Sequence, residues 1–486
     1  MMASRGTAWF DLTRESLRSD FLAPLAIGLW SAAIAAAPGT TLKLLLLAPA
    51  IAAGAIWWTI LRPQRWLILF FICLLLTPPL PIPLGDSGVH TAPLFAALGL
   101  LAGVLRMKQW RSLVSPLPLA FLAFTAVLAM SLSFAALYSG VDLALRSLLR
   151  VGLFAIAVYV FVWAFAGPRQ PNADPIRFTR FLYIVAILAG LFACADFYFQ
   201  FPAPAGFEQQ FVWLDDAVLR RAQGLFYEAS TLGNFCAFFL VMTIVAFFRP
   251  RPKSSLPGLD SPCSRPVLAA GGLVFAAALI LSYSRASIIA VIVACVTLAF
   301  LRRARPGRVL IGAAVALIFA ATVVQLAVPS FAANYWNRID TSFQDILVTP
   351  DGVFTGRLAT WSALLHFLAS QPWHAIFGIG YKTLPYTSFA GAPIVADNTY
   401  LSLLVETGLI GLFVFLVLNF LILRGGLRAA RSRFPRASFL GEWIFCFWVG
   451  EMVQMMSGDL VTYWRVLPVY FWVLGTAVRE SSGAPE

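Results

Sequence analysis

Apolar runs long enough to cross a membrane recur along the whole chain and restrict what it can fold into. About 14 of them can be marked in its 486 residues. A helix of about 20 apolar residues spans the hydrocarbon core of a bilayer and satisfies its backbone hydrogen bonds internally. The runs are too continuously apolar for barrel strands, which alternate over about 10 residues. We therefore expect an all-α integral membrane protein with about 14 transmembrane helices.

The order of these runs predicts how the chain is divided. The expected spans are 21–36, 42–61, 66–83, 91–105, 117–138, 148–166, 180–201, 222–248, 267–284, 286–301, 309–328, 398–423, 439–456 and 462–478. They separate a cytoplasmic N-terminal segment (1–20), a transmembrane bundle of about 11 spans (21–328), a large periplasmic loop (329–397), C-terminal spans (398–478) and a cytoplasmic tail (479–486). The N-terminal segment mixes aromatic, aliphatic and charged residues, so it is either a short interfacial helix or a disordered tail.

The basic residues orient the spans. The formal net charge is +13, with 35 Lys and Arg residues. They form no single patch, which argues against a nucleic-acid partner. With both termini inside, 25 of the 35 fall in cytoplasmic segments, as the positive-inside rule expects. Ten cations remain on the expected outer side, where orientation does not explain them: Lys43, Arg146, Arg150, Arg220, Arg221, Arg285, Arg338, Arg357, Lys382 and Arg465.

Several classes of soluble enzyme lack support in the sequence. Only 12% of the residues are charged, against about 25% in a typical soluble domain. The six cysteines are scattered without a CxxC pair, which predicts neither a disulfide nor a metal site. The sequence contains no HExxH, DxD, Walker or GxSxG motif, so protease, ATPase and nucleotide-sugar chemistry are unsupported. We expect no metal and no cofactor.

One polar stretch, residues 355–411, interrupts the apolar pattern and is where we expect chemistry at a membrane surface. Its first part predicts an amphipathic helix that rests on the membrane or caps the bundle, because apolar residues recur there at helical spacing. Pro372 is expected to end this helix. The apolar positions are Leu358, Trp361, Leu364, Leu365 and Leu368.

The second part of this stretch leads from Asp397 into an apolar run. Asp397 fits a helix N-cap, a role that Asp and Asn commonly fill. Asn398, Ser402 and Glu406 then follow at intervals of four and predict a polar stripe down one helix face. Such a stripe inside a bilayer is expected to face protein or water, so the sequence also indicates a functional role for it.

Two arginines on the expected outer side stand out. Arg221 lies seven residues before Glu228, about two helical turns, which predicts a shared helix face. It is either an interfacial arginine paired with a buried glutamate, or part of an anion site in which Glu228 holds the arginine in place. Arg285 follows Ser284 in a tight turn between two apolar runs, and its planar guanidinium suits phosphate oxygens.

Taken in order, these elements resemble the bacterial O-antigen ligase and O-antigen polymerase superfamily. The similarity covers roughly residues 220–411. It is carried by Arg-x-x-Gly-x-Phe at 221–226 with the following Tyr227-Glu228-Ala229-Ser230, by Ser284-Arg285, and by Gly356-Arg357, Trp361, Pro372, Gly378-Ile379-Gly380, Asp397-Asn398-x-Tyr400-Leu401 and Glu406-x-Gly408.

The resemblance implies a metal-independent glycosyltransferase of the bacterial inner membrane, with its active site on the periplasmic side. Its donor would be an undecaprenyl-pyrophosphate-linked oligosaccharide, and its other partners a glycan acceptor, the lipid bilayer, a chain-length regulator and other polysaccharide assembly proteins. Arg221 and Arg285 would bind and neutralise the departing pyrophosphate, while Asp397 would contact or deprotonate the acceptor hydroxyl. The residues expected to bind substrate are Arg357, Glu228, Asn398, Tyr400 and Ser284.

One position departs from the family pattern. Many relatives carry His-Asn where this chain has Asp397-Asn398. Free Asp has a pKa of about 3.9 against about 6.5 for His and is the weaker base, although burial can raise that value. The change weakens a close match to an O-antigen ligase that transfers glycan to a lipid A core and leaves a polysaccharide polymerase, the interpretation we favour, open. It also leaves open that Asp397 only orients the acceptor. A lipid-linked glycan transporter or flippase and a non-catalytic export scaffold remain as alternatives.

Overall fold

The computed structural model describes residues 28–33, 35–62, 64–80, 89–168, 174–203, 209–213, 218–249, 262–302, 357–389, 391 and 393–483, with single positions between 312 and 340. The expected N-terminal segment 1–20 lies outside the described residues, as do most of the expected span 309–328 and most of residues 329–356. The described part is helical apart from one antiparallel hairpin, in which β1 (Phe211–Trp213) pairs with β2 (Val218–Arg220).

Contacts divide the chain into two units, Met1–Trp66 and Leu67–Glu486. The first carries α2 (Thr40–Leu61) and the start of α3. The other helices of the described part are α3 (Arg65–Leu76), α4 (Ala92–Leu105), α5 (Pro116–Ser139), α6 (Val141–Ala166), α7 (Pro175–Phe199), α8 (Ala229–Phe247), α9 (Arg265–Leu281), α10 (Arg285–Leu301), α14 (Arg357–Ser370), α15 (Pro372–Phe377), α16 (Thr399–Ala430), α17 (Pro435–Gln454) and α18 (Leu467–Ser481).

Five of the described helices, α5, α6, α7, α8 and α16, are long and apolar enough to cross a membrane. Shorter apolar helices lie between them, among them α3, α4, α9 and α10. The expectation of a helical, multi-pass membrane protein is therefore confirmed. The count of 14 spans and the assignment of the two sides stay predictions.

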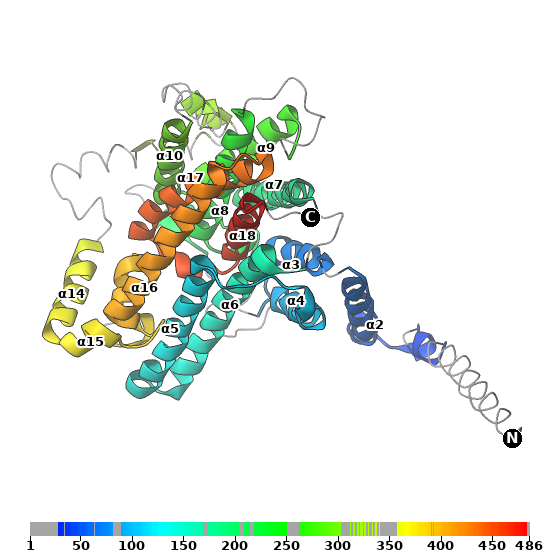
Figure 1. The fold of residues 1–486 in the computed structure, drawn as a ribbon, viewed down its shortest axis with the longest axis horizontal. Helices are drawn as coiled ribbons and strands as arrows, with labels where there is room; N and C mark the ends of the chain where they lie inside the picture. The colour runs from blue at the N-terminus through cyan, green and yellow to red at the C-terminus, as the bar shows by residue number, and fades with distance from the viewer. Residues whose placement is uncertain are drawn as a thin grey trace, which may run out of the picture. The chain divides into compact units, whose positions relative to one another are not determined.

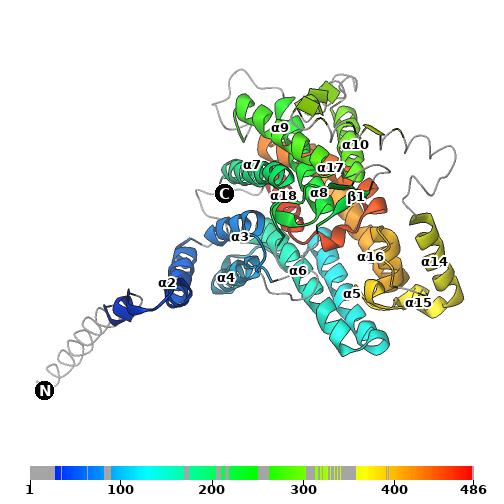
Figure 2. The ribbon, with the colours of Figure 1, turned by 180° about the vertical axis from the view of Figure 1, so that it is seen from behind.

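Helix α8 forms the centre of the second unit. It packs against α9, α10 and α17, as both ribbon views show (Figures 1 and 2). Its most apolar window is 89% buried, far more than in the other membrane-length helices. Two polar contacts fix it laterally, because the Asn234 amide donates to Glu451 on α17 and accepts from Tyr470 on α18. A buried polar group that is satisfied in this way specifies how the helices align.

The start of α8 corrects one prediction. The expected span 222–248 begins seven residues late, at Ala229, and the preceding residues form a loop containing the short 3-10 turn Gly224–Phe226. Gly224 has a φ of 55°, and a Cβ there would lie 2.8 Å from the Cβ of Ala193. Arg221 and Glu228 therefore do not share a helix face, and that prediction is wrong.

The expected amphipathic helix is confirmed as α14, which ends before Pro372. Its buried side is formed by Leu364, Phe367 and Leu368, whereas Leu365 is 54% exposed. These buried residues pack with others from the following loop and from the start of α16. Figure 1 shows α14 and α15 beside that end of α16. The helix thus packs beside the start of α16, and its position relative to the membrane stays a prediction.

Candidate active site

A cavity of about 690 Å³ in the second unit gathers charged side chains from segments far apart in the sequence. Its walls come from α6, α14 and the first turn of α8, and from the loops before α4, α8, α16 and α18. Five cations line it, and all five belong to the ten that the sequence places on the outer side: Arg150, Arg221, Arg357, Lys382 and Arg465.

Three carboxylates, Glu228, Asp397 and Asp459, line the same cavity. Burial raises the pKa of Tyr463, and the charges of Glu228, Glu451, Asp459 and Asp397 raise it further. Tyr463 lines the cavity together with these three carboxylates. Because cations exceed carboxylates, the cavity favours anionic ligands, and both hydrogen-bond donors and acceptors line it.

The loop before α8 is held by a buried ion pair. Arg220 donates to Asp196 on α7 at 3.0 Å, and the other Asp196 oxygen accepts the Gly224 backbone N–H at 3.1 Å. This fixed loop presents Arg221 to the cavity. The Arg221 Nε donates to the Ser282 carbonyl at 2.8 Å, which ties the guanidinium to the turn before α10.

Glu228 is the residue that precedes the first turn of α8. The Thr231 hydroxyl donates to its carboxylate at 2.6 Å. Burial raises the pKa of Glu228 above its usual range, and the neighbouring Asp459 raises it further, while Arg221 and Arg150 act in the opposite direction. Arg221 and Glu228 thus both line the cavity, and their expected partnership stays a prediction.

Asp397 is held by Arg357, the first residue of α14. The guanidinium Nε and Nη2 each lie 3.2 Å from one Asp397 oxygen, and Nη1 donates to the Ser457 hydroxyl at 2.9 Å. The Asp397 side chain is 48% exposed, and its backbone is left-handed with a φ of 46°. This carboxylate is accessible and is oriented by Arg357. The sequence suggested that burial would make Asp397 a stronger base, but its side chain is only half-buried.

The cap of α16 corrects another prediction. Asn398, and not Asp397, is the N-cap, because its side-chain oxygen accepts the backbone N–H groups of Tyr400 at 3.0 Å and Leu401 at 3.1 Å. The Tyr400 hydroxyl donates to the Met452 carbonyl at 2.9 Å. Asn398 and Tyr400 therefore serve the structure of α16 and are not among the side chains that line the cavity.

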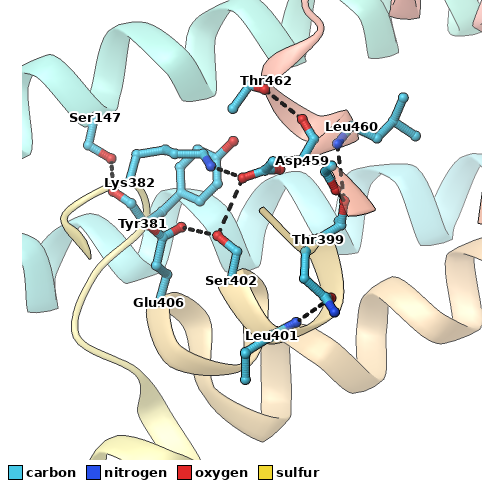
Figure 3. Close-up of polar contacts among 12 residues, drawn as sticks. Ser147, Tyr381, Lys382, Thr399, Leu401, Ser402, Glu406, Asp459, Leu460 and Thr462 are labelled. Carbon is cyan, nitrogen blue, oxygen red and sulfur yellow. Dashed lines mark hydrogen bonds and ion pairs between the residues drawn. The ribbon is translucent and has the colours of Figure 1, made fainter. Parts of the chain in front are cut away.

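The polar stripe on α16 is confirmed for Ser402 and Glu406, whereas Asn398 caps the helix. Ser402 and Glu406 are buried and face protein. The Ser402 hydroxyl lies 3.4 Å from the Glu406 carboxylate and 3.3 Å from that of Asp459 (Figure 3). Lys382 donates to the same Asp459 oxygen. The stripe thus leads from the cavity wall into the bundle.

Ser284 and Arg285 lie beside the cavity and not in its wall. Ser284 precedes α10 and its hydroxyl lies 2.7 Å from that of Ser287, while Arg285 begins the helix and is partly exposed. Their turn still contacts the site, since it supplies the Ser282 carbonyl that holds Arg221. Of the eight residues selected from the sequence, all within the described part, the cavity brings together Arg221, Glu228, Arg357 and Asp397.

Arg465 is a site residue that the sequence identified only as one of the outer cations. It is buried, and its guanidinium donates to the carbonyls of Leu74, Thr77 and Leu225. Burial lowers the pKa of Arg465 to about 10, so it stays charged at neutral pH. It ties the end of α3 to the loop before α8. Burial, assisted by Arg465, lowers the pKa of His90 to about 4, so this histidine is neutral.

Arg150, Lys382 and Asp459 are further charged lining residues that were not among the eight selected from the sequence. Arg150 and Lys382 were visible as unexplained outer cations, whereas no pattern marked Asp459. Among the described residues, no group of three His, Cys, Asp or Glu side chains is placed to hold a metal ion.

Comparison with protein families matches residues 270–416 to the O-antigen ligase family. The matched segment runs from α9 into α16 and includes Arg285, Arg357, Lys382 and Asp397. The resemblance to the O-antigen ligase and polymerase superfamily is therefore confirmed over this segment. A comparison with curated proteins gives no match. Arg221 and Asp459 lie outside the matched segment but share its cavity.

Proposed function

We propose that this chain, whose residues 270–416 belong to the O-antigen ligase family, transfers glycan from an undecaprenyl-pyrophosphate donor at the periplasmic face of the bacterial inner membrane. The observation that carries the proposal is the cavity in which five cations and three carboxylates meet. Its cations suit the pyrophosphate, and its carboxylates suit sugar hydroxyls. The reaction most consistent with the sequence is polymerisation of a polysaccharide.

The cations act on the donor. Guanidinium groups bind phosphate oxygens with two parallel hydrogen bonds, and Arg221 and Arg357 both face the cavity. Arg285, in the adjoining turn, would reach the headgroup from the side. Negative charge builds on the pyrophosphate as the bond to the sugar breaks. Fixed cations stabilise that developing charge without needing to reorganise.

The carboxylates act on the acceptor. An acceptor hydroxyl oxygen forms a bond to the anomeric carbon, the bond from this carbon to the pyrophosphate oxygen breaks, and the electron pair leaves with the pyrophosphate. The hydroxyl proton must pass to a base within hydrogen-bond reach. Asp397 is accessible and oriented by Arg357, so it is suited to contact the acceptor sugar.

A second candidate reaction is O-antigen ligation, which the description of the matched family favours. The aspartate at 397, where many relatives have histidine, weakens a close match to the ligase and leaves the polymerase open. A transporter would be expected to bind its substrate near the midplane between broken helices. A scaffold would have no need of the paired cations and carboxylates of the cavity.

The glycans of a deletion strain complemented with wild type or with Arg221→Ala test this proposal. A polymerase predicts that the variant accumulates single repeats on the lipid carrier and no long polymer. A ligase predicts long polymer that stays on the carrier and is missing from its final acceptor. Normal glycan in a strain that expresses Arg221→Ala at the wild-type level would exclude both reactions at this cavity.

A further inference from the structure

A buried polar chain leads from the cavity into the bundle, and the proposed reaction has not yet used it. Asp459 lies at its cavity end, in the turn between α17 and α18. Figure 3 shows that Lys382 and Ser402, from two other segments, point toward it, and that Glu406 points toward Ser402. Asp459 is 17% exposed and Lys382 7% exposed at their side chains.

The backbone of Asp459 is fixed to the start of α16. The carbonyl of Gly458 accepts hydrogen bonds from the backbone N–H of Thr399 at 3.1 Å and from its hydroxyl at 2.7 Å. On the other side, the Leu460 N–H donates to the Thr399 hydroxyl oxygen at 3.0 Å. Both neighbours of Asp459 are thereby held by one threonine, and the carboxylate cannot drift from the cavity wall without breaking these bonds.

The backbone of Lys382 is fixed by its neighbours, as that of Asp459 is. The φ of 57° at Lys382 is left-handed, a conformation that is unfavourable in a residue other than glycine and persists only where neighbours impose it. Here the preceding residue is fixed at both ends, because the Tyr381 N–H donates to Ser131 at 3.3 Å and the Tyr381 carbonyl accepts from Ser147. A buried ammonium requires a charged partner, and Asp459 supplies it.

The Ser402 hydroxyl lies between two carboxyl groups, those of Asp459 and Glu406. A hydroxyl has one proton, so it can donate to only one of them at a time. The second contact becomes a hydrogen bond only when the other carboxyl carries a proton. The second oxygen of Glu406, Oε1, is buried and has no hydrogen-bond partner in the described part of the chain. The three groups together therefore have room for one more proton.

We propose that Asp459 receives the proton of the acceptor hydroxyl and passes it through Ser402 to Glu406. This rests on the proposed glycosyl transfer. As the new bond to the anomeric carbon forms, the hydroxyl proton moves to Asp459. Asp459 then donates to the Ser402 oxygen, while the Ser402 proton moves to Glu406. Asp459 returns to its charged form beside Lys382, and a neutral acid, which is cheaper to bury than a charged one, remains at Glu406.

Asp459 is then the catalytic residue, and Ser402 and Glu406 are positioning residues. Asp397 would orient the acceptor without taking its proton. These separate roles for Asp459 and Asp397 agree with the exposure of their side chains, since Asp397 is 48% exposed and already bound to Arg357. Asp459 is the cavity carboxylate that the described contacts connect to a buried acid.

Kinetics of the purified protein with a lipid-pyrophosphate-linked repeat unit test the proposal. Asp459→Asn is expected to lower kcat about 100-fold, within the range for loss of a general base, with an unchanged donor KM. Glu406→Gln is expected to lower kcat about tenfold, again without a change in the donor KM. Asp397→Asn should affect the acceptor KM more than kcat.

The double variant Lys382→Met with Asp459→Asn separates chemistry from structure. It leaves no unpaired charge, and removal of both partners of a buried pair is often tolerated by the fold. We expect it to melt like wild type and to stay as inactive as Asp459→Asn. Recovered activity would show that Asp459 serves only to neutralise Lys382. If Asp459→Asn transfers glycan like wild type while Arg221→Ala is inactive, the proton path is wrong and the proposed glycosyl transfer stands. If both variants transfer glycan like wild type, the proton path and the proposed glycosyl transfer are both wrong.

Discussion

The three cavity carboxylates differ in the groups that hold them, and this gives each a separate task. Among the described contacts, Asp397 is bound to a guanidinium, Asp459 to an ammonium and a hydroxyl, and Glu228 to a hydroxyl. A carboxylate is stabilised by an adjacent cation and destabilised by burial. Burial raises the pKa of Glu228, so the charged form of this side chain costs stability.

The substitution Glu228→Gln tests that cost. A folded-state pKa raised above its usual value of 4.5 means that the cost is absent at pH 4 and complete once the pH exceeds the raised pKa. The variant is therefore expected to raise the Tm at pH 8 by roughly 1–4 °C, with no gain at pH 4, and to slow glycan transfer. Melting curves of the detergent-solubilised protein at both pH values measure this. A lower Tm at pH 8 would contradict the assignment.

At the scale of residues, four of the eight site residues predicted from the sequence line the cavity. Arg221 and Arg357 could be found because each stands out as a cation outside the positive-inside pattern. Asp459 could not, because its partner Lys382 is 77 residues away and no local spacing relates them. Ser284, Arg285, Asn398 and Tyr400 were chosen with the same motifs, but their side chains lie outside the cavity wall.

At the scale of elements, the break in α16 binds the segment that leads to Lys382. Gly408 has a φ of 71°, which interrupts the helix. The carbonyls of Val405 and Glu406, next to the break, accept the backbone N–H groups of Ile379 and Gly380 at 3.1 and 2.9 Å. The turn Gly378-Ile379-Gly380 therefore donates hydrogen bonds to the broken helix. It also positions Lys382, which lies two residues after Gly380.

The substitution Gly408→Ala tests the importance of this break. A Cβ at 408 would lie 2.1 Å from the Ile376 carbonyl oxygen, and the backbone conformation is unfavourable for any L side chain. We expect a loss of about 2 kcal/mol or more of stability and loss of transfer. Gly152→Ala in α6 is the control, because a Cβ there meets nothing within 4 Å, so its Tm should match or exceed that of wild type. Equal Tm values for the two variants would show that the break is not required.

Helix existence followed from the sequence more reliably than helix ends. The expected spans 117–138 and 286–301 coincide with α5 and α10 to within a residue or two, since long apolar runs leave few alternatives in a membrane. The start of α8 was misplaced by seven residues because Asp196, on α7, binds the Gly224 N–H. A contact between distant segments decided that boundary, and an apolar run does not reveal it.

At the scale of the whole molecule, cations that orientation does not explain gather at one cavity. Orientation by the positive-inside rule left ten cations unexplained, and five of them line the cavity. They come from separate parts of the chain, so their meeting follows from the fold and not from any one motif. This convergence is the main reason to place lipid-pyrophosphate chemistry at this cavity, and it extends the site beyond the segment matched by the O-antigen ligase family.

The most direct measurement is transfer by the purified protein in liposomes from an undecaprenyl-pyrophosphate-linked repeat unit, with Arg150→Ala compared with Arg146→Ala. The two arginines lie one turn apart on α6, but Arg150 lines the cavity and Arg146 is exposed outside it. We predict that wild type and Arg146→Ala extend the glycan at similar rates, and that Arg150→Ala is slower by about tenfold or more, as for loss of a group that stabilises the leaving charge. Equal rates for the two variants, or no transfer by wild type, would contradict the account.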